Sequence, residues 1–378
     1  MQIVKKQEKA GIICFYLAIL IHSIVMCVGY SSAEVPFRGK LLIAAWGLCC
    51  FKILTTKYDK AEWIVMAIAG AVGVTCYVSA GEKYLLYVAV LIFAAKSVDM
   101  GKVLRCVGIS ALAAALIVAV LSLFGIGGAI VDTRDYGRGM VESRYCLGFS
   151  HANNLHGTVW YLMCLYVYIF RDKIGWKSYT VLTIINIGMY LLTGSRTGVA
   201  VTEAVVLAGL MHTYLNKYVW GKMWPYIAGM LAFLATIVIT VVSVSVDCYT
   251  GYGPVLNKLN SITTGRLSLA YQSAYIGDWR PFMQGGAHVS TVDNGFAAVA
   301  SDYGYVALIV FVAFIVWLLI KLTVTKNGIL YAIAVTAILY TFMERSYTIN
   351  DAYLLSNLLY VAAMITLGED YERKEHQA

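Results

Sequence analysis

The sequence predicts an all-α polytopic membrane protein, and three observations lead to this fold class. Hydrophobic residues make up 60% of the 378 residues and charged residues only 13%, whereas soluble domains carry about 25% charged residues. The mean hydropathy is +0.72. The apolar residues are grouped in windows of roughly 15 to 25 residues, the length at which a helix crosses a bilayer. With only four prolines to mark linkers, we expect residues 1–378 to form a single transmembrane domain.

The apolar windows predict about twelve transmembrane helices, with about ten as the lower limit because one window is short and two are closely spaced. Their approximate limits are 10–30, 40–55, 62–80, 84–95, 103–125, 154–170, 178–194, 197–215, 223–246, 295–321, 328–346 and 351–368. The first window follows three lysines and precedes Ser31-Ser32-Ala33, which resembles a signal-peptide cleavage site. Its length is nevertheless that of a spanning helix, so we expect an uncleaved first span.

Loop charges predict that both termini lie in the cytoplasm. Most of the 29 lysines and arginines fall in loops on the side of the N-terminus, as the positive-inside rule requires of cytoplasmic loops. The same rule explains the net charge of +8 without nucleic acid as a partner. The basic residues on this side are mostly lysines, whereas those on the outer side are mostly arginines, namely Arg38, Arg134, Arg138, Arg144, Arg196, Arg266, Arg280 and Arg345.

The outer arginines have two interpretations. Arginine is preferred where a planar fork must hold phosphate or carboxylate by paired hydrogen bonds, which predicts an anion-binding site. Alternatively, these arginines form ion pairs with outer acids such as Glu142, Asp278 and Glu344.

Residues 126–153 form the first of two long outer loops. This loop and the start of the next span hold several arginines and acids, two histidines and two asparagines. Asn153 and Asn154 are candidate site residues, or they cap the sixth span. His151 and His156 are five residues apart with no cysteine beside them, so a zinc site is not expected.

Residues 247–294 form the second long outer loop. Arg266 starts an apolar-periodic run that predicts a short amphipathic helix at the outer interface; its apolar members are Leu267, Leu269, Tyr271, Ala274 and Tyr275. His288, Asp293 and Asn294 precede the next span. Asp293 is either a helix cap or a carboxylate placed to take a proton from a substrate hydroxyl.

An arginine interrupts the apolar stretch Met189–Leu207. An arginine inside a lipid core is costly, but the topology places Thr193 to Thr197 in a tight turn at the outer surface. Gly194 allows the turn, and Gly198 leaves room beside the Arg196 guanidinium. Glu203 lies on a similar face of the following span, either as a partnered carboxylate or as part of a cavity.

Motifs for soluble enzyme chemistry do not occur. Neither GIGGAI at Gly125 nor GYGPVL at Gly251 completes a dinucleotide or P-loop fingerprint, and there is no HExxH, GxSxG or CxxC. The nine cysteines follow no metal-binding spacing. We therefore expect neither a cofactor nor a metal.

Four motifs together resemble the O-antigen polymerase/ligase superfamily of Wzy-like polymerases and related ligases. They are Arg144 leading to GFSHANNLHG, LLTGSRTG between two spans, TTGR in the last outer loop, and STVDNGFAAVASDYGY entering the following span. Their order and spacing match over about residues 138–310. The resemblance implies a GT-C-like integral-membrane glycosyltransferase of a bacterial cytoplasmic membrane. Its active site would lie on the outer face and polymerise undecaprenyl-diphosphate-linked oligosaccharide units for capsule or O-antigen.

The resemblance also implies roles for individual residues. Arg196, Arg266 and either Arg144 or Arg138 are expected to hold the diphosphate, without a metal. Asp293 or His288 is expected to activate the acceptor hydroxyl. The supporting residues are Asn153, Asn154, Ser195 and Asn294. A chain-length regulator and a repeat-unit flippase are the candidate protein partners, beside membrane lipid.

Two alternatives remain open from the sequence. A ligase of the family would transfer a finished glycan to another acceptor, but ligases typically have histidine where this chain has Asp293. A flippase or transporter for the same glycan should show broken helices and polar residues near mid-membrane, whereas here the polar residues gather at the outer rim.

Overall fold

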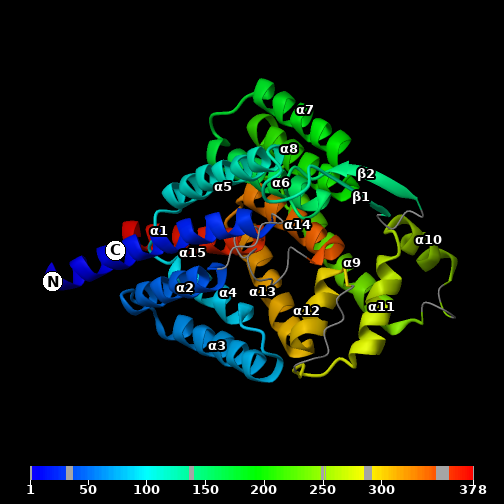
Figure 1. Ribbon diagram of the computed structural model, residues 1–378. Coiled ribbons are helices and arrows are strands. Elements are labelled where there is room, and N and C mark those ends of the chain that lie inside the picture. The colour runs from blue at the N-terminus through cyan, green and yellow to red at the C-terminus, as the bar shows by residue number, and fades with distance from the viewer. Residues whose placement is uncertain are drawn as a thin grey trace.

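The computed structural model describes residues 2–30, 37–135, 140–247, 251, 253–284, 292–345 and 357–377. Within these residues the chain is helical apart from one two-stranded antiparallel sheet (Figure 1). The elements are α1 (Gln2–Tyr30), α2 (Arg38–Leu54), α3 (Lys60–Ala80), α4 (Tyr84–Ala94), α5 (Met100–Leu123), β1 (Val131–Asp135), β2 (Val141–Tyr145), α6 (Ala152–Phe170), α7 (Trp176–Thr193), α8 (Arg196–Leu215), α9 (Trp224–Ser245), α10 (Pro254–Ile262), α11 (Arg266–Gly277), α12 (Gly295–Tyr303), α13 (Tyr305–Val324), α14 (Gly328–Met343) and α15 (Leu358–Gln377).

The helices follow the predicted spans closely. Every predicted window overlaps a helix, and one window, 295–321, is divided between α12 and α13. Among the described residues, six helices are long and apolar enough to cross a membrane, which is compatible with a multi-pass membrane protein. These six are α1, α3, α5, α8, α9 and α13.

The break between α12 and α13 has a specific cause at Gly304. This residue has φ +102°, and a Cβ there would lie 2.4 Å from the Pro281 carbonyl oxygen. The amides of Tyr305 and Val306, which begin α13, donate to the carbonyls of Arg280 and Pro281. The second outer loop thus satisfies donors that a new helix start leaves without partners. Helix α13 alone has the length of a span. The break at Gly304 therefore lies at the end of the candidate span and not in the middle of it.

The two ends of the helix bundle differ. Figure 1 shows the start of α1 and the end of α15 at one end, and the β1–β2 hairpin with α10 and α11 at the other. The core between them is continuous and includes edge-on ring pairs such as Trp160 with Tyr340 and Tyr226 with Tyr331. The hairpin and α10 occupy segments that the sequence interpretation left as loops.

The helix predicted at Arg266 is confirmed as α11, and Leu267 is the one residue of its expected apolar run that is buried in the protein. The buried residues are Leu267, Ala270, Ser273 and Gly277, at helical spacing. Three of the four are small, which lets α11 pack closely against α9. Tyr275, expected on the apolar face, is 78% exposed.

Candidate active site at the outer end of the bundle

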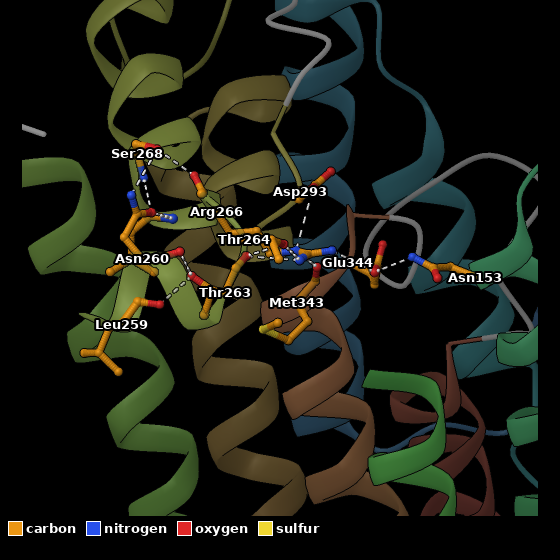
Figure 2. A network of polar contacts seen from close by, with 12 residues as sticks. Asn153, Leu259, Asn260, Thr263, Thr264, Arg266, Ser268, Asp293, Met343 and Glu344 are labelled. Atoms are coloured by element: carbon orange, nitrogen blue, oxygen red, sulfur yellow. Dashed lines mark hydrogen bonds and ion pairs between the residues drawn. The ribbon is translucent and has the colours of Figure 1, made fainter. Parts of the chain in front are cut away.

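Arg266 is the centre of a hydrogen-bonded network between α11 and the end of α14 (Figure 2). Its Nε donates to the carbonyl of Met343 at 2.8 Å. Its Nη1 donates to the Thr263 carbonyl and the Thr264 hydroxyl, at 3.1 and 2.7 Å. Its Nη2 donates to Glu344 Oε1 at 3.1 Å. These contacts occupy most of the five N–H groups of the guanidinium, so its orientation is fixed by the protein itself.

Glu344 directly follows α14 and links α11 with α6. Its Oε1 also accepts a 2.9 Å hydrogen bond from Asn153 Nδ2 in α6 (Figure 2). Burial raises the pKa of this carboxyl to about 7; Arg266 opposes the shift in pKa and Asp293 adds to it. Glu344 therefore changes its protonation near neutral pH.

Asp293 faces the same guanidinium from another side. Its Oδ2 lies 3.6 Å from Arg266 Nε, and its side chain is 48% exposed. The helix-cap interpretation of Asp293 is wrong, because the next residue caps α12: Asn294 Oδ1 accepts from the amides of Phe296 and Ala297. Asp293 is thus a solvent-accessible carboxylate beside a fixed cation.

Asn294 is a structural residue in the arrangement observed. Besides capping α12, its Nδ2 donates to Thr240 Oγ1 in α9 at 3.0 Å. Its side chain is only 3% exposed. These contacts anchor the start of α12 to α9 and hold the adjacent Asp293 in place.

The cap interpretation is also wrong for Asn153 and Asn154. The cap of α6 is His151, whose backbone is extended and whose Nδ1 accepts from the amide of Asn153 at 3.0 Å. Both asparagines lie inside the first turn, where a side chain no longer reaches the free amides. Asn153 instead binds Glu344, and Asn154 Nδ2 donates to the Ser150 hydroxyl.

Arg144 lies against the turn that precedes Arg196. The side chain projects from β2, is buried, and donates through Nε and Nη2 to Glu142 Oε2 at 3.1 and 2.7 Å. A Cβ at Gly194 would lie 3.1 Å from Arg144 Nε. The absence of a side chain at Gly194 therefore lets the guanidinium pack onto the turn.

His151 connects the surroundings of Arg144 with those of Arg266. Burial lowers the pKa of this histidine to about 4, and the charges of Arg134, Arg144 and Arg266 lower its pKa further, against the charge of Asp132. The imidazole is therefore neutral near pH 7. Because both Arg144 and Arg266 act on one ring, the residues predicted from separate motifs belong to one electrostatic neighbourhood.

Arg196 differs from the other arginines of this region. It is the first residue of α8, it is exposed, and within the described residues its side chain makes no hydrogen bond or ion pair. The predicted turn is confirmed: Gly194 ends α7 with φ +62°, and Ser195 caps α8 by accepting from the amide of Gly198 at 3.3 Å. The Arg196 side chain is therefore exposed at the start of a helix and is not used by a protein acceptor among the described residues.

A buried chain of polar side chains supports the Arg196 turn. His156 Nδ1 contacts Thr193 Oγ1 at 3.0 Å, and its Nε2 contacts Asn186 Oδ1 at 3.1 Å. Asn186 Nδ2 donates to Glu203 Oε2, and the Thr183 hydroxyl donates to Glu203 Oε1. Glu203 is thus a partnered carboxylate, which answers the question left open by the sequence.

Gly198 was expected to leave room beside the Arg196 guanidinium, and this expectation is wrong. A Cβ at Gly198 would lie 2.7 Å from ring atoms of His156, so the space beside this glycine is filled by the imidazole and not by the guanidinium of Arg196. Gly198 therefore lets the polar chain approach α8.

Ion pairing of the outer arginines is confirmed for the three acids named from the sequence. The pairs are Arg144 with Glu142, Arg266 with Glu344, and Arg280 with Asp278. Arg345 likewise pairs with Asp302. Two predicted site residues, Arg138 and His288, lie outside the described residues.

The sequence interpretation missed two members of the site. Glu344 was considered only as a partner of arginine, although an acid immediately after an apolar span is a signal for a buried or interfacial carboxylate. His151 was considered only as a metal ligand. Its position directly before the sixth span was the signal that it caps the helix.

Comparisons with protein-family models, with curated proteins and with solved structures found no match. The resemblance carried by the four motifs therefore stays a prediction. Among the described residues no group of three or more His, Cys, Asp or Glu side chains is arranged to hold a metal ion.

Proposed function

We propose that the protein is a multi-pass membrane glycosyltransferase that polymerises lipid-diphosphate-linked oligosaccharide units on the outer face of a bacterial cytoplasmic membrane. The observation that carries this proposal is the exposed Arg196 at the start of α8, free of acid partners among the described residues, beside a neighbourhood of fixed charges. An arginine at a helix N-terminus combines a forked donor with the positive end of the helix dipole. Such a position suits a diphosphate.

The reaction follows from the charges around the site. The acceptor hydroxyl oxygen attacks the anomeric carbon of the donor sugar, and the bond from that carbon to the diphosphate oxygen breaks. The lipid diphosphate leaves with the bonding electron pair, and Arg196 stabilises its negative charge. The hydroxyl proton passes to the half-exposed carboxylate of Asp293, which Arg266 holds in position.

Arg266 and Arg144 act in this proposal mainly by positioning. Arg266 has most of its donors engaged by Met343, Thr263, Thr264 and Glu344, so it contributes charge more than new hydrogen bonds. Arg144 is buried against the turn and adds positive potential beneath Arg196. Three arginines were predicted to bind the diphosphate, and in this proposal Arg196 makes most of the contacts with it.

Neither alternative function explains the site as well. The break at Gly304 is the feature that favours a transporter, but a full span lies on one side of it, whereas transporters break helices near mid-membrane. Asp293 stands where ligases of the family that the four motifs resemble typically have histidine, which argues against a ligase.

The test uses purified protein with lipid-linked repeat units prepared from the organism's own membranes. The wild-type protein should give a ladder of products on a gel. Arg196→Lys keeps the charge but not the fork, and should lower the ladder at least about tenfold. Arg280→Lys is the matched control, because Arg280 is exposed and bound to Asp278 outside the site.

Three outcomes would count against the proposal. A normal ladder from Arg196→Lys would remove Arg196 from the diphosphate site. A single transfer to an unrelated acceptor by the wild-type protein would identify a ligase. Movement of the lipid across a vesicle bilayer without any product would identify a transporter.

A further inference from the structure

A cavity lies between the starts of α2 and α4, in the part of the chain that the candidate active site does not use. Its volume is about 210 Å³, and it is lined by Arg38, Gly39, Leu42, Lys83, Tyr84 and Tyr87. A water molecule takes about 30 Å³ in the liquid, so the cavity holds a group much larger than one water. None of the lining residues contributes to the network around Arg266.

The polar side of the cavity is positively charged. Arg38 is the first residue of α2 and Lys83 immediately precedes α4, so two basic side chains from separate helices line the same space. Neither helix has an acidic residue in its first turn or a side chain that caps its free amides. Proteins usually place acids at helix starts, where the dipole is positive; here two cations add to that potential.

The other lining side chains are apolar or aromatic. Leu42 and Tyr87 are 4% and 8% exposed, and the rings of Tyr84 and Tyr87 pack edge to face with centroids 6.1 Å apart. Lys83 Nζ lies 5.9 Å from the centre of the Tyr84 ring. The cavity is therefore lined by cations together with apolar and aromatic side chains.

We propose that this cavity binds a phosphate group, with its ester substituent against the Tyr84 and Tyr87 wall. Arginine binds phosphate through paired hydrogen bonds and lysine through a point charge, and the two are complementary around one anion. The size of the cavity and its apolar wall fit a phosphate monoester or diester better than the inorganic ion. The site does not depend on the glycosyltransferase proposal.

Gly39 gives the cavity a steric test. Gly39 lines the cavity and a Cβ there would meet nothing within 4 Å, so Gly39→Leu adds a bulky side chain at the cavity without a clash at its Cβ. Gly47 lies on the same helix, has the same open surroundings and does not line the cavity, so Gly47→Leu is the matched control. Lys40→Gln is the charge control for Arg38→Gln and Lys83→Gln, because Lys40 is exposed and lies over the Phe37 ring.

The experiment is native mass spectrometry of the full-length protein in detergent. The probes are dioleoylphosphatidylglycerol, dioleoylglycerol, which lacks the phosphate, and inorganic phosphate. Binding of the phospholipid should exceed that of dioleoylglycerol, and Arg38→Gln, Lys83→Gln and Gly39→Leu should each raise its Kd at least fivefold. The two controls should leave the Kd unchanged, and unchanged melting temperatures show that the variants are folded.

The outcomes distinguish a phospholipid headgroup from free inorganic phosphate as the ligand. Inorganic phosphate that binds alone, with the same dependence on the variants, supports a free phosphate as the ligand. Equal binding of phospholipid and dioleoylglycerol overturns the proposal. The same Kd in the cavity variants and the control variants also overturns it, as does the absence of binding by both phosphate probes.

Discussion

Arg196 and Arg266 stand in nearly the same local sequence, after Gly-Ser and Thr-Gly, yet their surroundings are opposite. Arg266 is 15% exposed in its side chain and is held by Met343, Thr263, Thr264 and Glu344. Arg196 is exposed and has no partner among the described residues. The difference shows that an arginine in a motif has one of two roles. It stabilises the structure of the site, as Arg266 does, or it remains available to bind a ligand, as Arg196 does.

The comparison also separates two ways of fixing a charge. Around Arg266 the guanidinium itself is fixed, because its donors are used within the protein. Around Arg196 the backbone is fixed instead, by Ser195, Gly194 and the polar chain through His156, while the side chain remains available. A ligand can bind Arg196 without breaking a hydrogen bond within the protein, whereas most donors of Arg266 are already used by protein acceptors.

The largest expected effect tests this contrast through stability. Arg266→Met should lower the free energy of unfolding by about 3 kcal/mol, because it leaves the Glu344 carboxyl buried without its cation. Arg196→Met should change it by less than about 0.5 kcal/mol, as for other exposed positions. Denaturant titration in mixed detergent micelles measures both values. Equal losses in the two variants would remove the distinction.

The second prediction concerns the support beneath Arg196. Asn186→Leu removes the contacts of Asn186 with His156, Glu203 and the Val199 carbonyl. We expect a loss of about 2 kcal/mol, since several interhelical bonds are lost at once. Thr180→Val is the control on the same helix, because its hydroxyl bonds only to its own helix at Trp176. A loss no greater than that of the control would show that the polar chain does not support the turn.

The third prediction is a pH dependence at Glu344. Its pKa is about 7 in the folded protein and about 4.5 when unfolded. The folded state thus binds the proton more tightly, and the stability from this group is present below pH 4.5 and is lost as the pH rises through 7. Glu344→Gln removes this loss while keeping an acceptor for Arg266 and Asn153.

The measurement compares unfolding of the wild-type protein and Glu344→Gln at pH 5 and pH 8. The variant should gain roughly 2 kcal/mol relative to the wild type over this interval, because only the wild type loses the proton-linked stability as the pH rises through the folded pKa. The contribution of His151 cancels because both proteins contain it. Parallel pH curves would contradict the raised pKa.

Much of the helical framework was predictable because apolar runs of spanning length depend on local composition. The turn at Gly194 and the helix starting at Arg266 were likewise predictable from glycine and periodicity. The break at Gly304 was not, because it depends on the backbone of Pro281, which is distant in sequence. The twelve-span count and the enzymatic class remain predictions.

The site was predictable in its members more than in their roles. Arg144, Arg196, Arg266 and Asp293 were named from motifs. Which arginine is free was not predictable, because the answer depends on Glu344, which lies 78 residues after Arg266. His151 and Asn294, the helix caps of the site, were misjudged because several polar residues stood at each helix start and geometry selects one.

The contact of Gly304 with Pro281 ties the length of the segment between α11 and α12 to the integrity of α13, which is long and apolar enough to cross a membrane. The carbonyls of Arg280 and Pro281 complete the first turn of α13, so this part of the second loop belongs mechanically to the helix that it precedes. Insertions or deletions between Arg280 and Phe282 would unravel the outer end of α13. Changes in the length of that loop are therefore tolerable only where its backbone carbonyls do not accept hydrogen bonds from the first amides of α13.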